Sequence, residues 1–216
     1  MGSRMMHLII ANQVFEKLEL SNQQGFLLGG IAPDAVFTRE GRNKSHFHEG
    51  YLDDGTRFVN YKAFIEKYHS EIHEEYILGY LTHLISDDVW MKFIYFKNDF
   101  YNRLATDPEL LGRWHDDFRK LNGKLIEKFE CGELKNKLFG ATMDNIVCEI
   151  DSKDLQSFTI ETLNDFTYNK EDIGKELQVY TFREINDYIA LATNTAQEVC
   201  SSIKNNTFNH KNNQSS

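Results

Sequence analysis

A histidine and an aspartate, His83 and Asp87, stand four residues apart in the most apolar segment of the chain, which includes GYLTHLISDDVW. In an α-helix this spacing places both side chains on one face. A carboxylate in such a segment needs compensation, because an unpaired buried charge is very costly. A metal ion would provide it, since imidazole and carboxylate both coordinate zinc at about 2.0–2.2 Å. Taken alone, the pair is better explained by a buried hydrogen bond that fixes the helix.

A second carboxylate, Asp34, lies in the segment FLLGGIAPDA. The glycines and the proline of this segment indicate irregular backbone between apolar elements, and a chain reversal there would point the carboxylate inward. Alternatively, Asp34 would be the N-cap of a helix that begins at Ala35. In the first case Asp34 and Asp87 give the candidate site two carboxylates.

Histidines supply the other candidate ligands. His46 and His48 lie in Ser-His-Phe-His, and alternate residues of an extended chain face opposite sides, so only one of the two is expected to face the site. His7 lies among apolar residues near the N-terminus, where a core histidine without a metal is the more common case. Together with His83 these residues supply enough nitrogen and oxygen ligands for one or two metal ions.

The elements that would carry these residues are helices. Ser3 is expected to cap a first helix over 4–20, and a central helix lies within 70–96, which is apolar on most of its sides. Other helices are expected over 56–69, 107–129, 152–166 and 181–203. A loop is expected over 38–55, and residues 134–150 could form either a helix or a loop. No period-2 strand or hairpin turn is found. The expected fold is therefore all-α: a single-domain multi-helix bundle over 1–203, with a disordered polar tail over 204–216.

Composition limits the class of function. The 216 residues are 41% hydrophobic, enough for one substantial core, and carry a net charge of −9. This charge argues against passive attraction to polyanions, so no stable nucleic-acid complex is expected. A metal centre could reverse the sign of the potential locally, which leaves an enzyme that acts on phosphate esters possible.

The cysteines and the apolar runs indicate the compartment. Three cysteines without CxxC spacing form neither a disulfide framework nor a thiolate zinc motif, and are expected to be buried free thiols of a reducing compartment. No signal-peptide pattern is visible, and no stretch approaches the roughly 20 apolar residues of a membrane span. The expected location is cytoplasmic.

The segments GGIAPDAV, Ser-His-Phe and GYLTHLISDDVW, with a histidine in the opening helix, resemble the zinc-dependent phospholipase C family. That family is all-helical and is related to the single-strand-specific zinc nucleases. The resemblance covers roughly residues 5–90; each piece is common, and the combination is fairly specific. It implies zinc-dependent hydrolysis of phosphate esters, with phosphodiesters as the expected substrates.

Carried over residue by residue, the resemblance implies that Asp34, His46, His83 and Asp87 hold one zinc ion. Asp87 would also bridge to a second ion, whose other side-chain ligand would be His7. Asp34 and Asp87 would then be the protein's carboxylates at the catalytic centre, where the ions activate water and neutralise phosphoryl oxygens. The family's third zinc needs histidines after the central helix that this chain largely lacks, so one or two ions are expected.

Two other interpretations stay open. A non-catalytic helical module would use the metal for stability and would coordinate it completely. An HD-type metal phosphohydrolase would use His115 and Asp116 as its dyad, which would have to lie at the centre of the fold. Arg42 and Lys44, which precede His46, could contact a substrate phosphate, although loop cations are usually solvated.

Overall fold

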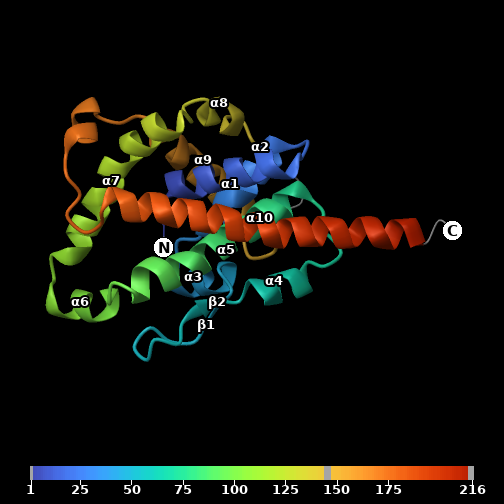
Figure 1. Ribbon diagram of the computed structural model, residues 1–216, viewed down its shortest axis with the longest axis horizontal. Coiled ribbons are helices and arrows are strands. Elements are labelled where there is room, and N and C mark those ends of the chain that lie inside the picture. Colours follow the sequence, from blue (N-terminus) through green and yellow to red (C-terminus); the bar gives the residue numbers. More distant parts are fainter. Residues whose placement is uncertain (1, 144–146, 214–216) are drawn as a thin grey trace.

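The computed structural model describes residues 2–143 and 147–213, and its helices pack around the buried helix α5 (Glu75–Trp90) (Figure 1). Every residue from Tyr76 to Trp90 is buried. Three helices pack most extensively against α5: α1 (Arg4–Leu18), α2 (Gln23–Ile31) and α10 (Phe182–Asn213). The all-α class and the buried central helix are therefore confirmed.

The other elements surround this core. They are α3 (Arg39–Ser45), α4 (Tyr61–Lys67), α6 (Phe100–Thr106), α7 (Leu110–Phe129), α8 (Leu134–Leu138) and α9 (Ser152–Asn164). A π-helical turn, Met91–Phe96, continues α5, and two 3₁₀ turns, Ala32–Asp34 and Lys170–Gly174, complete the described helices. In the described part of the chain no helix is long and apolar enough to cross a membrane.

The first helix forms where its cap predicts. The Ser3 hydroxyl accepts a hydrogen bond from the Met6 amide, which satisfies one of the unpaired donors of the first turn. Helix α1 ends at Leu18, and Glu19 follows in the left-handed conformation with φ of 50°. The predicted helix over 4–20 is therefore confirmed, with an end two residues earlier than expected.

Helix α2 corrects the expected irregular backbone over 26–35. Its glycines lie inside the helix, because α2 and α5 pack so closely that side chains would collide. A Cβ atom on Gly29 would lie 2.0 Å from the Tyr76 carbonyl oxygen, and one on Gly79 would lie 2.0 Å from that of Phe26. Only the turn Ala32–Asp34 departs from α-helix. Asp34 ends this turn and does not cap a helix at Ala35.

The expected loop over 38–55 was wrong in part. Thr38 caps α3 by accepting a hydrogen bond from the Gly41 amide at 3.1 Å, and His46 follows the last helical residue. The strands β1 (His48–Glu49) and β2 (Phe58–Val59) then form an antiparallel hairpin. Because α3 is short and charged and each strand has two residues, neither leaves a clear hydrophobic period in the sequence.

Helix α10 continues past the expected end at residue 203 and runs to Asn213. Its sequence contains neither glycine nor proline, so nothing in the backbone stops the helix where the apolar periodicity fades. Residues 214–216 of the expected tail lie outside the described residues. The division into a domain over 1–203 and a tail stays a prediction. Within 134–150 the structure shows α8, and residues 144–146 lie outside the described ones.

Candidate metal centre

All five residues singled out from the sequence meet in the interior of the fold. His7 comes from α1, Asp34 from the turn after α2, His46 from the end of α3, and His83 and Asp87 from α5. Two groups of three have ligand atoms within 4.8 Å of one another: His7, His83 and Asp87, and Asp34, His46 and His83. None of the five is more than 7% exposed. We refer to these five residues as the His/Asp cluster.

Asp87 lies at the centre of the cluster. Its Oδ1 atom is 3.4 Å from Nε2 of His7, and its Oδ2 atom is 3.4 Å from Nε2 of His46 and 3.5 Å from Nε2 of His83. Asp34 Oδ1 lies 3.3 Å from the same His46 nitrogen. The two oxygens of Asp87 thus face different histidines, which is the arrangement a bridging carboxylate requires.

Backbone carbonyls fix the tautomer of two of the histidines. Nδ1 of His83 lies 2.9 Å from the Gly30 carbonyl oxygen, and Nδ1 of His46 lies 2.9 Å from that of Arg42. A carbonyl oxygen only accepts hydrogen bonds, so each Nδ1 carries the proton in the neutral imidazole. Each Nε2 atom therefore presents a lone pair to Asp87.

Ser86 fixes the third histidine in the same way. Its hydroxyl donates to the His83 carbonyl oxygen at 2.8 Å and lies 3.0 Å from Nδ1 of His7. Because the hydroxyl hydrogen is already used, the Nδ1–H of His7 must donate to Ser86, which leaves Nε2 of His7 with its lone pair. Sequence reasoning missed Ser86, although its position three residues after His83 on the same helix was a usable signal.

Helix α3 is held against α5 by contacts around Ser45. The Tyr80 hydroxyl donates to the Ser45 carbonyl oxygen at 2.6 Å, and the Ser45 hydroxyl donates to the Pro33 carbonyl oxygen at 2.8 Å. These bonds connect α5, α3 and the turn that carries Asp34. They set the position of His46, the next residue in the chain.

The donor atoms of the cluster fit a metal ion. Nε2 of His7, His46 and His83 and both carboxylate oxygens of Asp87 are buried without a hydrogen-bond partner among the described residues. Such convergent, unpaired acceptors are costly unless a cation lies between them. Two ligands of a tetrahedral zinc ion lie about 3.3 Å apart. The separations of 3.3 to 3.5 Å match this value, and the imidazole and carboxylate donors suit zinc.

The electrostatics keep the carboxylates ionised. Burial opposes ionisation of Asp87, but the close contact with His83, 3.5 Å away, and the other histidines nearby outweigh it and hold the pKa of Asp87 well below its usual value. The pKa of Asp34 is lowered in the same way, with His46 as the main favourable contact. Burial, with His83 nearby, lowers the pKa of His7 to about 3. For His83 itself, Asp87 overcomes burial and raises the pKa.

The two histidines of Ser-His-Phe-His take different places. His46 is fully buried in the cluster. The ring of His48 stacks on that of His46 with centroids 5.2 Å apart, and His48 belongs to neither group of ligand atoms. Burial lowers the pKa of His48 to about 3. Of the two, the structure brings only His46 to the site.

The HD-type dyad does not lie at the centre of the fold. His115 is exposed on α7, and Asp116 forms ion pairs with Arg119 and Lys120 at 2.8 and 2.7 Å. Among the described residues neither His115 nor Asp116 belongs to a group that could hold a metal ion. This placement removes the structural basis of the HD interpretation.

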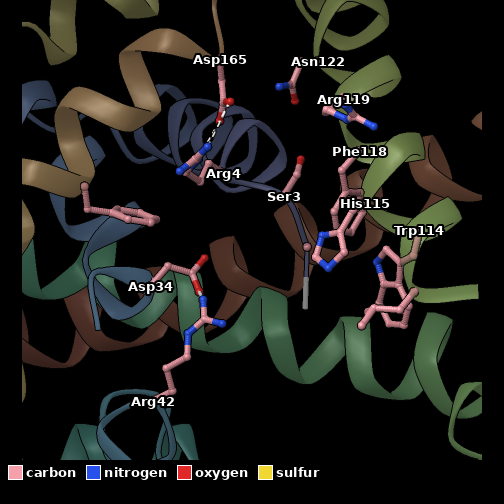
Figure 2. A pocket seen from close by; sticks show the side chains of 13 residues that line it. Ser3, Arg4, Asp34, Arg42, Trp114, His115, Phe118, Arg119, Asn122 and Asp165 are labelled. Carbon is pink, nitrogen blue, oxygen red and sulfur yellow. Dashed lines mark hydrogen bonds and ion pairs between the residues drawn. The ribbon is translucent and has the colours of Figure 1, made fainter. Parts of the chain in front are cut away.

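A cavity of about 500 Å³ lies beside the cluster (Figure 2). Asp34 belongs to both the cluster and the wall of the cavity, and its Oδ1 accepts a hydrogen bond from the Arg42 guanidinium at 3.0 Å. The rest of the wall comes from the first residue of α1 and the two residues before it, from one face of α7, and from α9 with Asp165 after it. We call this space the Asp34 cavity. It gives the cluster a side that a small molecule can approach.

Comparison with known families agrees with this geometry. Residues 6–90 match the sequence model of the family described as zinc dependent phospholipase C, and the match includes all five cluster residues. The suspected resemblance is therefore confirmed over this segment. No curated protein and no solved structure matches the chain significantly. The family match and the buried His/Asp groups together support a zinc-dependent hydrolase.

Proposed function

We propose that this protein is a metal-dependent phosphoric ester hydrolase that acts on phosphodiesters and uses one or two zinc ions. The observation that carries the proposal is the convergence of three Nε2 lone pairs on the Asp87 carboxylate, all buried and without hydrogen-bond partners among the described residues. The match to the zinc dependent phospholipase C family supports the type of reaction.

The residues divide into two ligand sets around Asp87. Asp34, His46, His83 and Asp87 would hold the first ion, and His7 with the other oxygen of Asp87 would hold the second. Zinc in such a site lowers the pKa of water to about 7 and neutralises charge on phosphoryl oxygens.

The chain's own groups orient and shield this chemistry. The hydrogen bonds from Nδ1 of His7, His46 and His83 keep the rings in place and keep each Nε2 unprotonated. The apolar residues of α5 and α1 exclude bulk water from the inner side of the cluster. On the cavity side, Arg42 contacts Asp34 through one terminal nitrogen, so its remaining N–H groups can donate to a phosphoryl oxygen.

The cavity favours a catalytic over a purely structural metal site. A structural zinc ion is enclosed by four protein ligands, whereas a catalytic one keeps an open position. Asp34 lies on the wall of the Asp34 cavity, so a substrate could reach the first ligand set there. A non-catalytic module would not need this opening.

We further propose that the substrates are small soluble phosphodiesters or monoesters in the cytoplasm. The net charge of −9 opposes binding to an anionic membrane surface. Phosphatidylcholine in bilayers should accordingly be turned over slowly or not at all.

The test compares p-nitrophenyl phosphate esters with phosphatidylcholine liposomes at matched zinc concentration and pH. We expect release of p-nitrophenol by the zinc-loaded protein, loss of activity with a chelator, and recovery when zinc is restored. Faster release of phosphocholine from liposomes would contradict the soluble-substrate proposal. Inactivity on every ester would favour the non-catalytic module.

A further inference from the structure

The face of α7 that turns toward the Asp34 cavity combines cationic and apolar residues. It consists of Leu111, Trp114, His115, Phe118, Arg119 and Asn122. Their spacing of one, three or four residues places them on one side of the helix. Figure 2 shows His115 and Arg119 on the α7 side of the cavity, whereas Asp34 and Arg42 come from the other side.

The two carboxylates in the cavity wall already have arginine partners. Asp165 accepts hydrogen bonds from Nε and a terminal nitrogen of Arg4 at 2.6 and 3.1 Å. Asp34 accepts one from Arg42 at 3.0 Å. Each of these two carboxylates is therefore paired with a guanidinium group, and Arg4 also pairs with Glu161, which does not line the cavity, at 3.0 Å.

The third arginine of the wall, Arg119, adds positive charge beyond this balance. Its partner Asp116 does not line the cavity; the contact uses one terminal nitrogen at 2.8 Å, and the side chain is 75% exposed. Asp116 also pairs with Lys120 at 2.7 Å, so its charge is shared between two cations. His115, four residues before Arg119 on the same face, adds further ring N–H donor capacity. The α7 side of the cavity thus offers an anion-binding corner in a protein whose net charge is −9.

We propose that the Asp34 cavity binds the alcohol part of the substrate and selects phosphate esters whose alcohol carries a second anionic group, a carboxylate or a phosphate. Arg119 and His115 bind that group, while the apolar side chains of Leu111 and Phe118 contact the carbon body between the two anionic ends. A cationic head group is disfavoured, because each carboxylate of the wall already has an arginine partner. This inference rests on the proposed function, which places the phosphoryl group at the cluster.

The test measures binding of two probes of equal length to the zinc-loaded protein by calorimetry: 4-phosphonobutanoate, and its neutral-ended analogue 4-phosphonobutanamide. Both carry a phosphonate for the cluster, and only the first has a second anionic end. The wild-type protein should bind the carboxylate probe more tightly. Arg119→Gln should weaken binding of the carboxylate probe about tenfold and leave the amide probe nearly unchanged.

Arg183→Gln is the matched control. Arg183 is an arginine on α10 whose side chain is 90% exposed and which pairs with Asp187 four residues later, as an ordinary surface cation does. The control should keep the wild-type preference for the carboxylate probe.

Three results would contradict binding of a second anionic group by Arg119 and His115. They are equal binding of the two probes by the wild-type protein, binding of neither probe, and an equal loss of binding of both probes in Arg119→Gln. Hydrolysis of a p-nitrophenyl phosphate ester, whose alcohol carries no second anionic group, separates this failure from failure of the proposed function. Turnover of that ester without any probe preference would support the proposed hydrolase and contradict the proposed selectivity for a second anionic group. Probe preference without turnover of any ester would support the anion-binding site and contradict the proposed hydrolase.

Discussion

The hydroxyl of Ser86 lies 3.0 Å from Nδ1 of His7 while donating its own hydrogen to the His83 carbonyl oxygen, so a serine one turn along α5 determines which nitrogen of His7 faces Asp87. Removal of the serine frees the His7 ring to rotate or change tautomer. Such hydrogen-bond partners of metal ligands typically contribute about 10- to 100-fold to metal affinity.

We therefore expect Ser86→Ala to weaken binding of the zinc ion that His7 would hold by about tenfold or more while the fold is retained. Competition with a chromogenic chelator measures the affinity. Ser202→Ala is the control, because Ser202 makes a comparable hydrogen bond to the Glu198 carbonyl oxygen at an exposed position of α10. Unchanged zinc affinity in Ser86→Ala would show that this hydroxyl does not orient His7.

The close packing of α2 on α5 predicts a large effect for one added methyl group. A Cβ atom on Gly79 would meet the Phe26 carbonyl oxygen at 2.0 Å, so Gly79→Ala must force the helices apart. We expect destabilisation of about 3 kcal/mol or more in urea unfolding. The matched control is Gly112→Ala on α7, where the added atom has nothing within 4 Å and should stabilise by up to about 1 kcal/mol. Equal effects of the two substitutions would contradict the packing argument.

The loop histidines provide a direct comparison. His46→Ala should release metal, because Nε2 of His46 faces both Asp34 and Asp87. His48→Ala should retain metal, because His48 only stacks behind His46. Metal content of the two purified variants measures this difference. Loss of metal in His48→Ala with retention in His46→Ala would mean that the wrong histidine has been assigned to the site.

Acidification should destabilise the chelator-treated, metal-free protein between pH 6.5 and pH 3. In this range His7 stays neutral in the folded state, where its pKa is about 3, but takes up a proton in the unfolded chain near 6.5. The unfolded state then binds more protons, so the free energy of unfolding falls as the pH decreases. His48 acts in the same direction, whereas His83, whose pKa is raised, is protonated in both states there.

Urea unfolding of the metal-free protein at pH 6.5 and pH 4.5 measures this dependence. His7→Gln should show a smaller loss of stability between the two pH values than the wild-type protein. An equal loss in both proteins would mean that His7 is not the group whose proton uptake is linked to unfolding.

The residues of the candidate site could be selected from the sequence because their chemistry conflicts with their surroundings. His83 and Asp87 stand out in an apolar helix, and Asp34 stands out after an apolar run, whatever the details of the backbone. Residue type alone left open whether His46 or His48 reaches the site. That choice depends on the end of α3 and on the hairpin after it, which leave little hydrophobic pattern.

The glycines of α2 show why part of the fold was missed. In sequence, Gly29 and Gly30 suggest a break in secondary structure, since glycine weakens an isolated helix. In the fold, Gly29 permits contact with the backbone of α5, so tertiary packing outweighs local propensity. Likewise the residue types of Ser86 and of the cavity face of α7 do not stand out in the sequence. Their roles depend on residues of other elements that lie next to them in the fold, such as His7 beside Ser86 and Asp34 across the cavity from α7.

The most direct measurement of the central claim is the zinc content of the purified protein after zinc-supplemented expression, compared with that of Asp87→Asn. Asp87 contacts all three histidines of the cluster, so a neutral amide there removes charge from both ligand sets. Circular dichroism would show that the variant keeps its helices. We predict about one to two zinc ions per wild-type chain and almost none in the variant. A wild-type protein without zinc, or a variant that retains the wild-type amount, would contradict the assignment of the metal centre.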